Sequence, residues 1–321
     1  MIRGTPQGTR ALADASVAQV SQALVGPGIW LDVGATMVRA QSDSTVFAAQ
    51  LKAVYAHFPF LDSAEWADLH VQIRRPFNAR RWLRPQVRFR CDGLQPFDPF
   101  PADSPLPLFE WGCNSLIARR LNDLLLLHAG VVERAGLALI LPALPGSGKS
   151  TLTAALSQRG WRLLSDEFGA LDPQSGSLRA VLKPIALKNR SIEVIRRFAP
   201  KASLGPEFTK TRKGTVAHLA PPQDAVDRRH EPATPGAIVL PRWTAGSPTR
   251  FEPVRENVLF PALAFNAFNY GLLGAAGFQS AVRLVRQCPA WQLIYSDLDD
   301  ALATIDAAWP QVIERHRAAA A

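Results

Sequence analysis

Residues 143–150 of the chain read Ala143-Leu144-Pro145-Gly146-Ser147-Gly148-Lys149-Ser150. An apolar segment, Leu137–Leu141, precedes this stretch, and a segment of helical character, Ser150–Arg159, follows it. A Walker A loop requires this context, because it joins a buried strand to a helix. Alanine stands where the first glycine of the motif usually lies, a variant that such loops tolerate. The stretch therefore predicts a phosphate-binding loop rather than a glycine-rich turn without a ligand.

The residue types of this loop follow from the chemistry of phosphate binding. Two glycines without a Cβ atom allow positive φ, so that successive backbone N–H groups can point at phosphate oxygens. The following helix adds the positive end of its dipole. The lysine places its charge on the β and γ phosphates, and the last serine is a ligand for Mg²⁺. We expect the nucleotide to contact Pro145, Gly146, Ser147, Gly148, Lys149, Ser150 and Thr151.

Two adjacent carboxylates, Asp166 and Glu167, end the next predicted strand, Arg162–Ser165. In P-loop enzymes an acidic residue at this place orients Mg²⁺ or its water. A second carboxylate can accept a proton from an attacking hydroxyl. An Asp-Glu pair in a surface turn is the alternative, and the P-loop just upstream favours the catalytic interpretation.

His128 lies between two apolar runs, Leu124–Leu127 and Val131-Val132. The pattern predicts an apolar helix over Leu116–Leu127 and two short strands over Ala129–Val132 and Leu137–Leu141. Taken alone, a histidine between a helix and a strand is more often a hydrogen-bonded structural residue than a catalytic one.

The combination of these segments resembles a known family. His128-Ala129-Gly130, the loop 145–150 and the segment 162–167 together resemble the catalytic domain of HPr kinase/phosphorylase. His128 lies twenty-one residues before Lys149, and Asp166 lies seventeen residues after it, as in that family. Leu187–Ser191 and Lys213–Leu219 look typical of the HPr kinase-related kinases, above all the subgroup termed kinase A, found near exosortase and surface-polysaccharide genes.

The resemblance implies roles for individual residues. Asp166 would be the base that activates the acceptor hydroxyl, with His128 beside it and Lys149 on the transferring phosphate. Glu167 replaces the second aspartate of the family and, with Ser150, would hold Mg²⁺.

Two further basic residues, Lys188 and Lys213, lie in the segments that look typical of the subgroup and would neutralise phosphate charge. The chain lacks the Arg-Gly-Leu-Gly-Ile-like segment of authentic HPr kinases, and Lys183–Lys188 occupies its place. That segment helps to contact the protein substrate and supports the reverse reaction. The resemblance therefore implies a kinase without naming HPr as its acceptor.

The resemblance also implies the fold and the domains. We expect an α/β P-loop kinase domain of the HPr kinase/phosphoenolpyruvate carboxykinase type, with a mixed central sheet, over residues 108–321. Residues 1–107 would form a smaller N-terminal α/β region for partner recognition. The proline-dense stretch Pro96–Pro107 marks the boundary, because proline lacks an N–H donor and fixes φ. Family members form oligomers, which makes a homo-oligomer an expectation here.

Composition narrows the function classes. Hydrophobic residues make up 47% and charged residues 20% of the 321 residues, as in a globular protein. Neither a membrane-spanning run nor a signal peptide is recognisable, which predicts a cytoplasmic protein. The three cysteines lack metal-site spacing. The excess of nine basic residues is dispersed over short arginine pairs, so nucleic acid is not an expected partner.

The leading hypothesis is an ATP- and Mg²⁺-dependent kinase that transfers the γ phosphate to a hydroxyl of a protein, peptide or small-molecule acceptor. The sequence does not name that acceptor. The main alternative is an NTP-binding regulatory or assembly module with slow hydrolysis and no phosphoacceptor. A nucleotide-driven nucleic-acid enzyme is a third hypothesis, favoured only by the basic surplus.

Overall fold

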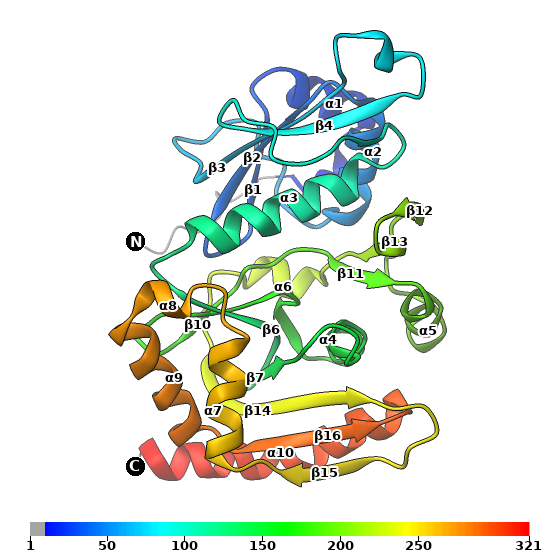
Figure 1. The fold of residues 1–321 in the computed structure, drawn as a ribbon. Coiled ribbons are helices and arrows are strands. Elements are labelled where there is room, and N and C mark those ends of the chain that lie inside the picture. The colour runs from blue at the N-terminus through cyan, green and yellow to red at the C-terminus, as the bar shows by residue number, and fades with distance from the viewer. Residues whose placement is uncertain (1–9, 321) are drawn as a thin grey trace. The chain divides into compact units, whose positions relative to one another are not determined.

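Contacts within the chain divide it into two units, shown in the computed structural model of Figure 1. The structure describes residues 10–320. The first unit extends to Arg120 and includes a second segment, Lys183–Val226. The other unit is formed by Leu121–Leu182 and by the chain from Asp227 onward. Both units contain helices and sheets, so the predicted mixed α/β class is confirmed.

A five-stranded sheet lies at the centre of the first unit and consists, in this order, of β1 (Ile29–Asp32), β2 (Met37–Ser42), β3 (Leu69–Arg74), β4 (Gln86–Cys91) and β5 (Phe100–Pro101). Strands β2 and β3 pair in parallel, and the other neighbours are antiparallel. The helices of this part are η1 (Leu12–Asp14), α1 (Val17–Val25), α2 (Thr45–Val54), η2 (Ala79–Arg81) and α3 (Pro105–Arg120). A capping box fixes the start of α1, where Ser16 and Gln19 exchange side chain-to-backbone hydrogen bonds.

The segment 183–226 adds a small antiparallel sheet to the first unit. Its elements are β11 (Ile185–Lys188), α5 (Arg190–Phe198), β12 (Phe208–Thr211), β13 (Gly214–Leu219) and α6 (Gln223–Asp227), with sheet order β11-β13-β12. A buried ion pair attaches the segment, since Lys183 Nζ lies 3.0 Å from Glu110 Oε2 on α3. Tyr55 Oη donates a 2.7 Å hydrogen bond to the other oxygen of the same carboxylate.

The division of the chain differs from the predicted boundary at residues 107 and 108. Helix α3 begins at Pro105 and continues through Pro107, because the first turn of a helix does not use its N–H groups. The helix then packs on the sheet and on α2 of the first unit, and the Phe109 ring lies 5.2 Å from that of Phe47 on α2. The proline-dense stretch thus leads into a helix of the first unit, and the chain passes to the second unit after Arg120.

An eight-stranded mixed sheet forms the centre of the second unit. Its strands are β6 (Leu125–Arg134), β7 (Leu137–Pro142), β8 (Arg162–Ser165), β9 (Phe168–Leu171), β10 (Leu178–Arg179), β14 (Thr234–Trp243), β15 (Arg250–Pro253) and β16 (Ala290–Tyr295). The order is β10-β9-β6-β7-β14-β16-β15, and β8 also pairs with β6. Strands β7, β14 and β16 run parallel, whereas β6 is antiparallel to β7, β8 and β9.

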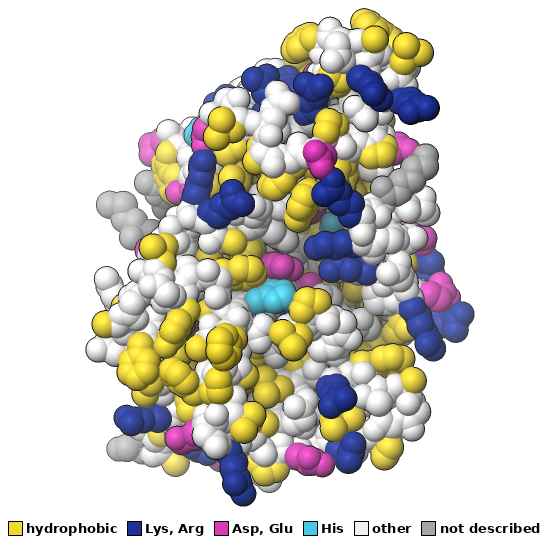
Figure 2. All heavy atoms as spheres, in the orientation of Figure 1, with side chains coloured by type: hydrophobic (Ala, Val, Ile, Leu, Met, Phe, Trp, Pro, Cys, Tyr) yellow, Lys and Arg dark blue, Asp and Glu magenta, His cyan; other side chains and the backbone are white. Residues whose placement is uncertain are grey.

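Five helices accompany this sheet: α4 (Lys149–Ser157), α7 (Glu256–Phe265), α8 (Tyr270–Leu273), α9 (Ala275–Gln287) and α10 (Leu298–Ala320). Helices α4 and α10 contact each other, and Trp161 and Trp309 stack edge to face at 4.5 Å. Hydrophobic side chains gather on the surface of α7–α9, at the lower left of Figure 2, where Phe265 is 91% exposed. Within residues 10–320, no helix has the length and hydropathy needed to cross a bilayer.

The predicted helix Leu116–Leu127 was wrong in its second half. Helix α3 ends at Arg120, and strand β6 begins at Leu125, so His128 lies inside a strand. A short apolar run such as Leu124–Leu127 has no period that separates a buried strand from a buried helix. Because the sheet buries this run, Leu125–Leu127 forms the start of strand β6 and not the end of a helix.

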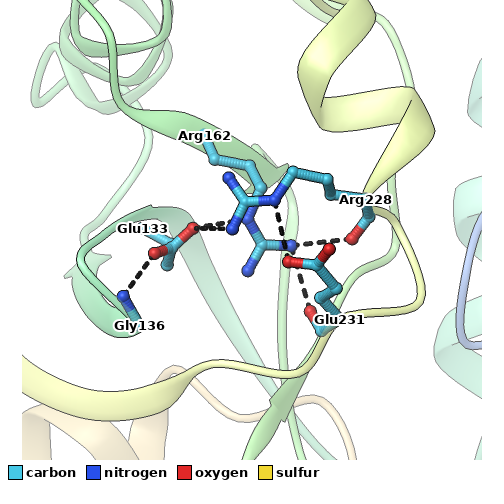
Figure 3. Close-up of polar contacts among 5 residues, drawn as sticks. All are labelled: Glu133, Gly136, Arg162, Arg228 and Glu231. Atoms are coloured by element: carbon cyan, nitrogen blue, oxygen red, sulfur yellow. Dashed lines mark hydrogen bonds and ion pairs between the residues drawn. The ribbon is translucent and has the colours of Figure 1, made fainter.

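A buried ion pair fixes the register of β8 against β6 (Figure 3). Arg162 Nε lies 2.5 Å from Glu133 Oε2, and both side chains are almost completely buried. Arg162 also donates to the backbone carbonyls of Arg228 and Glu231, at 2.8 and 3.0 Å. The second oxygen of Glu133 accepts the Gly136 N–H at 2.6 Å. Both charges are thus hydrogen-bonded, as buried charges must be.

Breaking this pair from one side should cost more than removing both partners. Arg162→Met leaves the Glu133 carboxylate buried without its main partner, and we expect a loss of about 3–5 kcal/mol in the free energy of unfolding. The double variant Arg162→Met/Glu133→Met should lose less than the sum of the two single variants. Urea unfolding of the four proteins measures this difference. Additive losses would contradict the coupling.

A second buried polar group lies in the first unit. His218, on β13, is 2% exposed, and its Nδ1 atom has no hydrogen-bond partner within residues 10–320. Burial lowers the pKa of His218 to about 4. The unfolded chain takes up this proton below about pH 6.5, while the folded protein does so only near pH 4. Stability should therefore fall as the pH drops between these values.

As the pH falls from 7 to 5, we expect proton uptake by His218 in the unfolded chain to lower the free energy of unfolding by about 2 kcal/mol. The matched variant His218→Gln has no proton to gain, so its unfolding free energy should fall less over the same range. Urea unfolding at both pH values compares the two proteins. An equal fall in both would show that His218 does not titrate as its burial requires.

Candidate functional site

The predicted phosphate loop lies at the carboxyl end of a parallel strand. It leaves β7 after Pro142 and enters α4 at Lys149. The backbone of Gly146 has φ +88° and that of Gly148 has φ +90°, both in the left-handed region. A Cβ atom built at Gly146 would meet nothing within 4 Å, so the outside of the loop faces open space. Ligands of α/β sheets bind at this end of parallel strands.

Two residues at the ends of neighbouring strands support the loop. Tyr295, the last residue of β16, donates from its hydroxyl to the Gly148 carbonyl at 3.2 Å. The backbone N–H of Trp243, at the end of β14, donates to the Ser147 carbonyl at 2.8 Å. A Cβ at Gly148 would lie 2.6 Å from the tyrosine hydroxyl, so this contact requires glycine. Burial raises the pKa of Tyr295, which keeps its hydroxyl a donor.

The two carboxylates, residues 166–167, lie in the turn between β8 and β9. Both strands pair with β6, one after the other. The register places Ser165 opposite Val131 and Phe168 opposite His128. The carboxylate pair therefore lies outside the paired segments, opposite residues 129 and 130 in the middle of β6.

Ser165 holds this turn through its side chain. Its Oγ atom accepts hydrogen bonds from the N–H groups of Glu167 and Phe168, at 3.3 and 3.0 Å. Serine commonly stabilises turns in this way. The serine that precedes the carboxylates in the sequence motif thus has a structural role in the turn.

The loop lysine and the predicted base lie at the same place. Lys149 Nζ donates to the backbone carbonyl of Asp166 at 2.5 Å, and both residues are buried. Charges interact more strongly where water is excluded. The structure thus brings together two residues that are seventeen positions apart in the sequence.

His128 approaches the second carboxylate. Its Nε2 atom lies 3.6 Å from Glu167 Oε1, and both side chains are partly exposed. The His128 ring also packs against Phe268 with a centroid distance of 5.5 Å, and the His128 N–H donates to the Asn266 carbonyl at 2.6 Å. The resemblance predicted His128 beside Asp166, and the carboxylate of the next residue, Glu167, lies 3.6 Å from the His128 Nε2 atom.

Residue 130 must be glycine because helix α4 packs closely against strand β6 at this position. A Cβ atom at Gly130 would lie 2.2 Å from Oγ1 of Thr153, which is fully buried on α4. The same Oγ1 donates to the Lys149 carbonyl at 2.9 Å. Helix α4 therefore packs on β6 at a distance that only glycine permits. This contact sets the helix of the phosphate loop relative to His128.

The residues of the loop fit a magnesium-bound nucleotide. Ser147 Oγ is shielded from water and has no hydrogen-bond partner in the described part of the chain, and Ser150 and Thr151 lie in the first turn of α4. Among residues 10–320, no group of three or more His, Cys, Asp or Glu side chains forms a metal site. Mg²⁺ in nucleotide sites commonly uses only one or two protein ligands, with phosphates and water completing the shell.

Lys188 and Lys213 belong to the first unit, whereas the phosphate loop belongs to the second. Asn189 brings the two lysines near each other. Its backbone N–H donates to the Thr215 carbonyl at 2.8 Å, and its side chain reaches the Lys213 carbonyl at 3.5 Å. Asn189 has φ +51°, a conformation that a non-glycine residue adopts rarely. The two basic segments thus form one local arrangement.

Sequence reasoning missed the residues that support the site. Tyr295 and Trp243 follow the loop by about a hundred residues or more and belong to no motif. They became visible only once the parallel order β7-β14-β16 was known. Thr153 carries a weak signal, because it lies one turn after Lys149 on the helix. No protein-family model matches the chain, and no curated protein matches it with significant similarity.

Gly130→Ala should disturb α4 without touching any group predicted to bind nucleotide. We expect a loss of about 1–3 kcal/mol in the unfolding free energy from overpacking, together with weaker nucleotide binding. Thr153→Ala in the same protein removes the clashing atom and should restore part of both. Urea unfolding and ATP titration of the single and double variants test this. If Gly130→Ala alone behaves as the wild type, the close approach is not a constraint.

Proposed function

We propose that this chain is a magnesium- and ATP-dependent kinase that phosphorylates a hydroxyl group, with the second unit as a P-loop catalytic domain of the HPr kinase type. The single observation that carries the proposal is the meeting of Lys149 with Asp166. The loop lysine donates to the backbone carbonyl of Asp166, a buried residue, near the carboxyl end of β7. In a site that only binds nucleotide, an acidic residue at this place would orient Mg²⁺, and the Asp166→Asn variant separates the two cases.

The loop orients the phosphates. The N–H groups of Gly146, Gly148 and Lys149, at the start of α4, would bind the anionic oxygens, and the Lys149 side chain would hold the group that is transferred. Tyr295 and Trp243 keep the loop rigid through its carbonyls. Little reorganisation then remains for the reaction itself, which is the main source of catalysis in phosphoryl transfer.

Asp166 is the base. One of its carboxylate oxygens accepts the proton of the acceptor hydroxyl as the hydroxyl oxygen bonds to the γ phosphorus of ATP, while the bond from that phosphorus to the β–γ bridging oxygen breaks and ADP leaves. The residue is 8% exposed, which keeps competing water away. The hydrogen bonds to Ser165 Oγ order the backbone on either side of Asp166, so that its carboxylate is held in place before the reaction. General-base catalysis of this kind contributes about 10²–10⁴-fold in rate.

Ser150 and Glu167 would hold the metal. Mg²⁺ held there would supply positive charge that offsets the charge developing on the transferred phosphate. Glu167 reaches further than an aspartate would, and the His128 Nε2 atom lies 3.6 Å from its carboxylate. We therefore assign His128 as a positioning residue for Glu167. Lys188 and Lys213 stand as additional phosphate-binding residues on the basis of the resemblance alone.

The test is transfer of γ-³²P from ATP to an acceptor. The acceptor pool is the small-molecule and protein fractions of a lysate from the organism that encodes the chain. Asp166→Asn should lower labelling at least about 100-fold while ATP affinity changes only a few-fold. Lys149→Met should lose both binding and labelling. Asp299→Asn, an exposed carboxylate on α10, is the matched control and should label as the wild type does.

Two outcomes would contradict the proposal. Labelling of an acceptor that persists in Asp166→Asn would remove this residue from its role as base. ATP binding with slow hydrolysis, no labelled acceptor and no effect of Asp166→Asn would favour a nucleotide-dependent regulatory module instead.

A further inference from the structure

The hairpin of β3 and β4 in the first unit carries a concentrated positive charge. Residues 74–90 contain seven arginines and neither aspartate nor glutamate. The sequence shows these arginines only as pairs and single residues. The hairpin folds them onto one end of the unit, because β3 and β4 are antiparallel neighbours joined by the loop 75–85.

Within the part of the chain that the structure describes, most of these arginines lack an acidic partner. Asp43 lies 3.4 Å from Arg75 and 4.0 Å from Arg81. For the other five, no carboxylate lies within ion-pair distance among residues 10–320; they are Arg74, Arg80, Arg84, Arg88 and Arg90. The arrangement is also unfavourable by itself, since Arg74 and Arg88 are directly opposite each other in the ladder. Arg84 adds backbone strain, with φ +54°. Folding stability therefore gives no reason for this charge.

The tip of the same hairpin exposes three large apolar side chains. Phe77 is 90% exposed, Trp82 is 73% exposed and Leu83 is 71% exposed. A short turn holds them in place, because Asn78 caps η2 and the Leu83 N–H donates to the Ala79 carbonyl at 2.8 Å. Figure 2 shows hydrophobic side chains at this end of the molecule with Lys and Arg side chains directly beside them.

We propose that the β3–β4 hairpin binds the surface of a membrane that contains anionic lipids. The apolar tip enters the boundary between headgroups and acyl chains, and the arginines behind it contact the lipid phosphates. Aromatic residues prefer this boundary, and each basic residue close to an anionic surface adds to the attraction. The proposal concerns peripheral binding and is independent of the proposed kinase activity.

The side chains at the tip favour a lipid surface over a nucleic acid. Single-stranded nucleic acids bind to flat aromatic platforms on which successive bases stack. Leu83 is aliphatic and cannot stack, yet it is as exposed as Trp82. The loop 75–85 presents exposed apolar side chains and arginines together, as the boundary between acyl chains and phosphates in a lipid monolayer requires. Nucleic-acid binding is therefore the competing outcome that the experiment must separate.

The experiment is flotation of the full-length protein with vesicles, either of phosphatidylcholine alone or with about one third phosphatidylserine. Wild type should float with the anionic vesicles only, and high salt should weaken the association. Phe77→Ser/Trp82→Ser/Leu83→Ser should reduce binding at least about tenfold. Phe265→Ser, at a 91% exposed position of the second unit, is the matched control and should bind as the wild type does.

Charge and insertion are tested separately. Arg80→Gln/Arg84→Gln should weaken vesicle binding, whereas Arg197→Gln/Arg212→Gln, which changes the net charge equally at exposed sites of the same unit, should not. Tryptophan emission should shift to shorter wavelength with anionic vesicles, and Trp82→Phe should abolish that shift.

Three results would overturn the proposal. The first is the absence of vesicle binding by a wild-type protein that circular dichroism shows to be folded. The second is binding that is unchanged in the triple tip variant. The third is tighter binding to a labelled single-stranded oligonucleotide, lost in the tip variant, with no vesicle binding.

Discussion

The buried pair of Glu133 and Arg162 is the interaction on which the rest of the candidate site depends. It fixes β8 against β6 in one register, since a slip of one residue would turn the side chains of β8 to the other face and leave two buried charges unpaired. Four residues after Arg162 the chain reaches Asp166. A structural pair at one end of a short strand thus determines where the carboxylates lie at its other end.

The other contacts of the candidate site are also arranged around strand β6. Strand β6 has β7 on one side and both β8 and β9 on the other, so the phosphate loop and the carboxylate turn flank residues 129–130. Gly130 lets α4 approach, and α4 carries Lys149 to the Asp166 carbonyl. The groups proposed to bind phosphate and to accept a proton are therefore held by strands and a helix. Such rigidity is what phosphoryl transfer needs, because its catalysis consists mainly of positioning and charge stabilisation.

The local part of this arrangement could be predicted from the sequence, and the long-range part could not. The loop 143–150 has its glycines, lysine and flanking elements within twenty residues, and the strand Arg162–Ser165 was predicted with its observed bounds. The start of β6 was missed because a short apolar run has no distinguishing period. The attachment of residues 183–226 to the first unit depends on Lys183 and Glu110, seventy-three positions apart, which no local pattern reveals.

The most direct test of the account is calorimetric titration of ATP into the wild type and Lys149→Met, with and without Mg²⁺, at one salt concentration. We predict binding by the wild type that strengthens with Mg²⁺, and no binding by the variant, with circular dichroism showing both proteins folded. Equal binding by the two proteins would contradict the account, as would the absence of binding by the folded wild type, because the loop would then not be a nucleotide site.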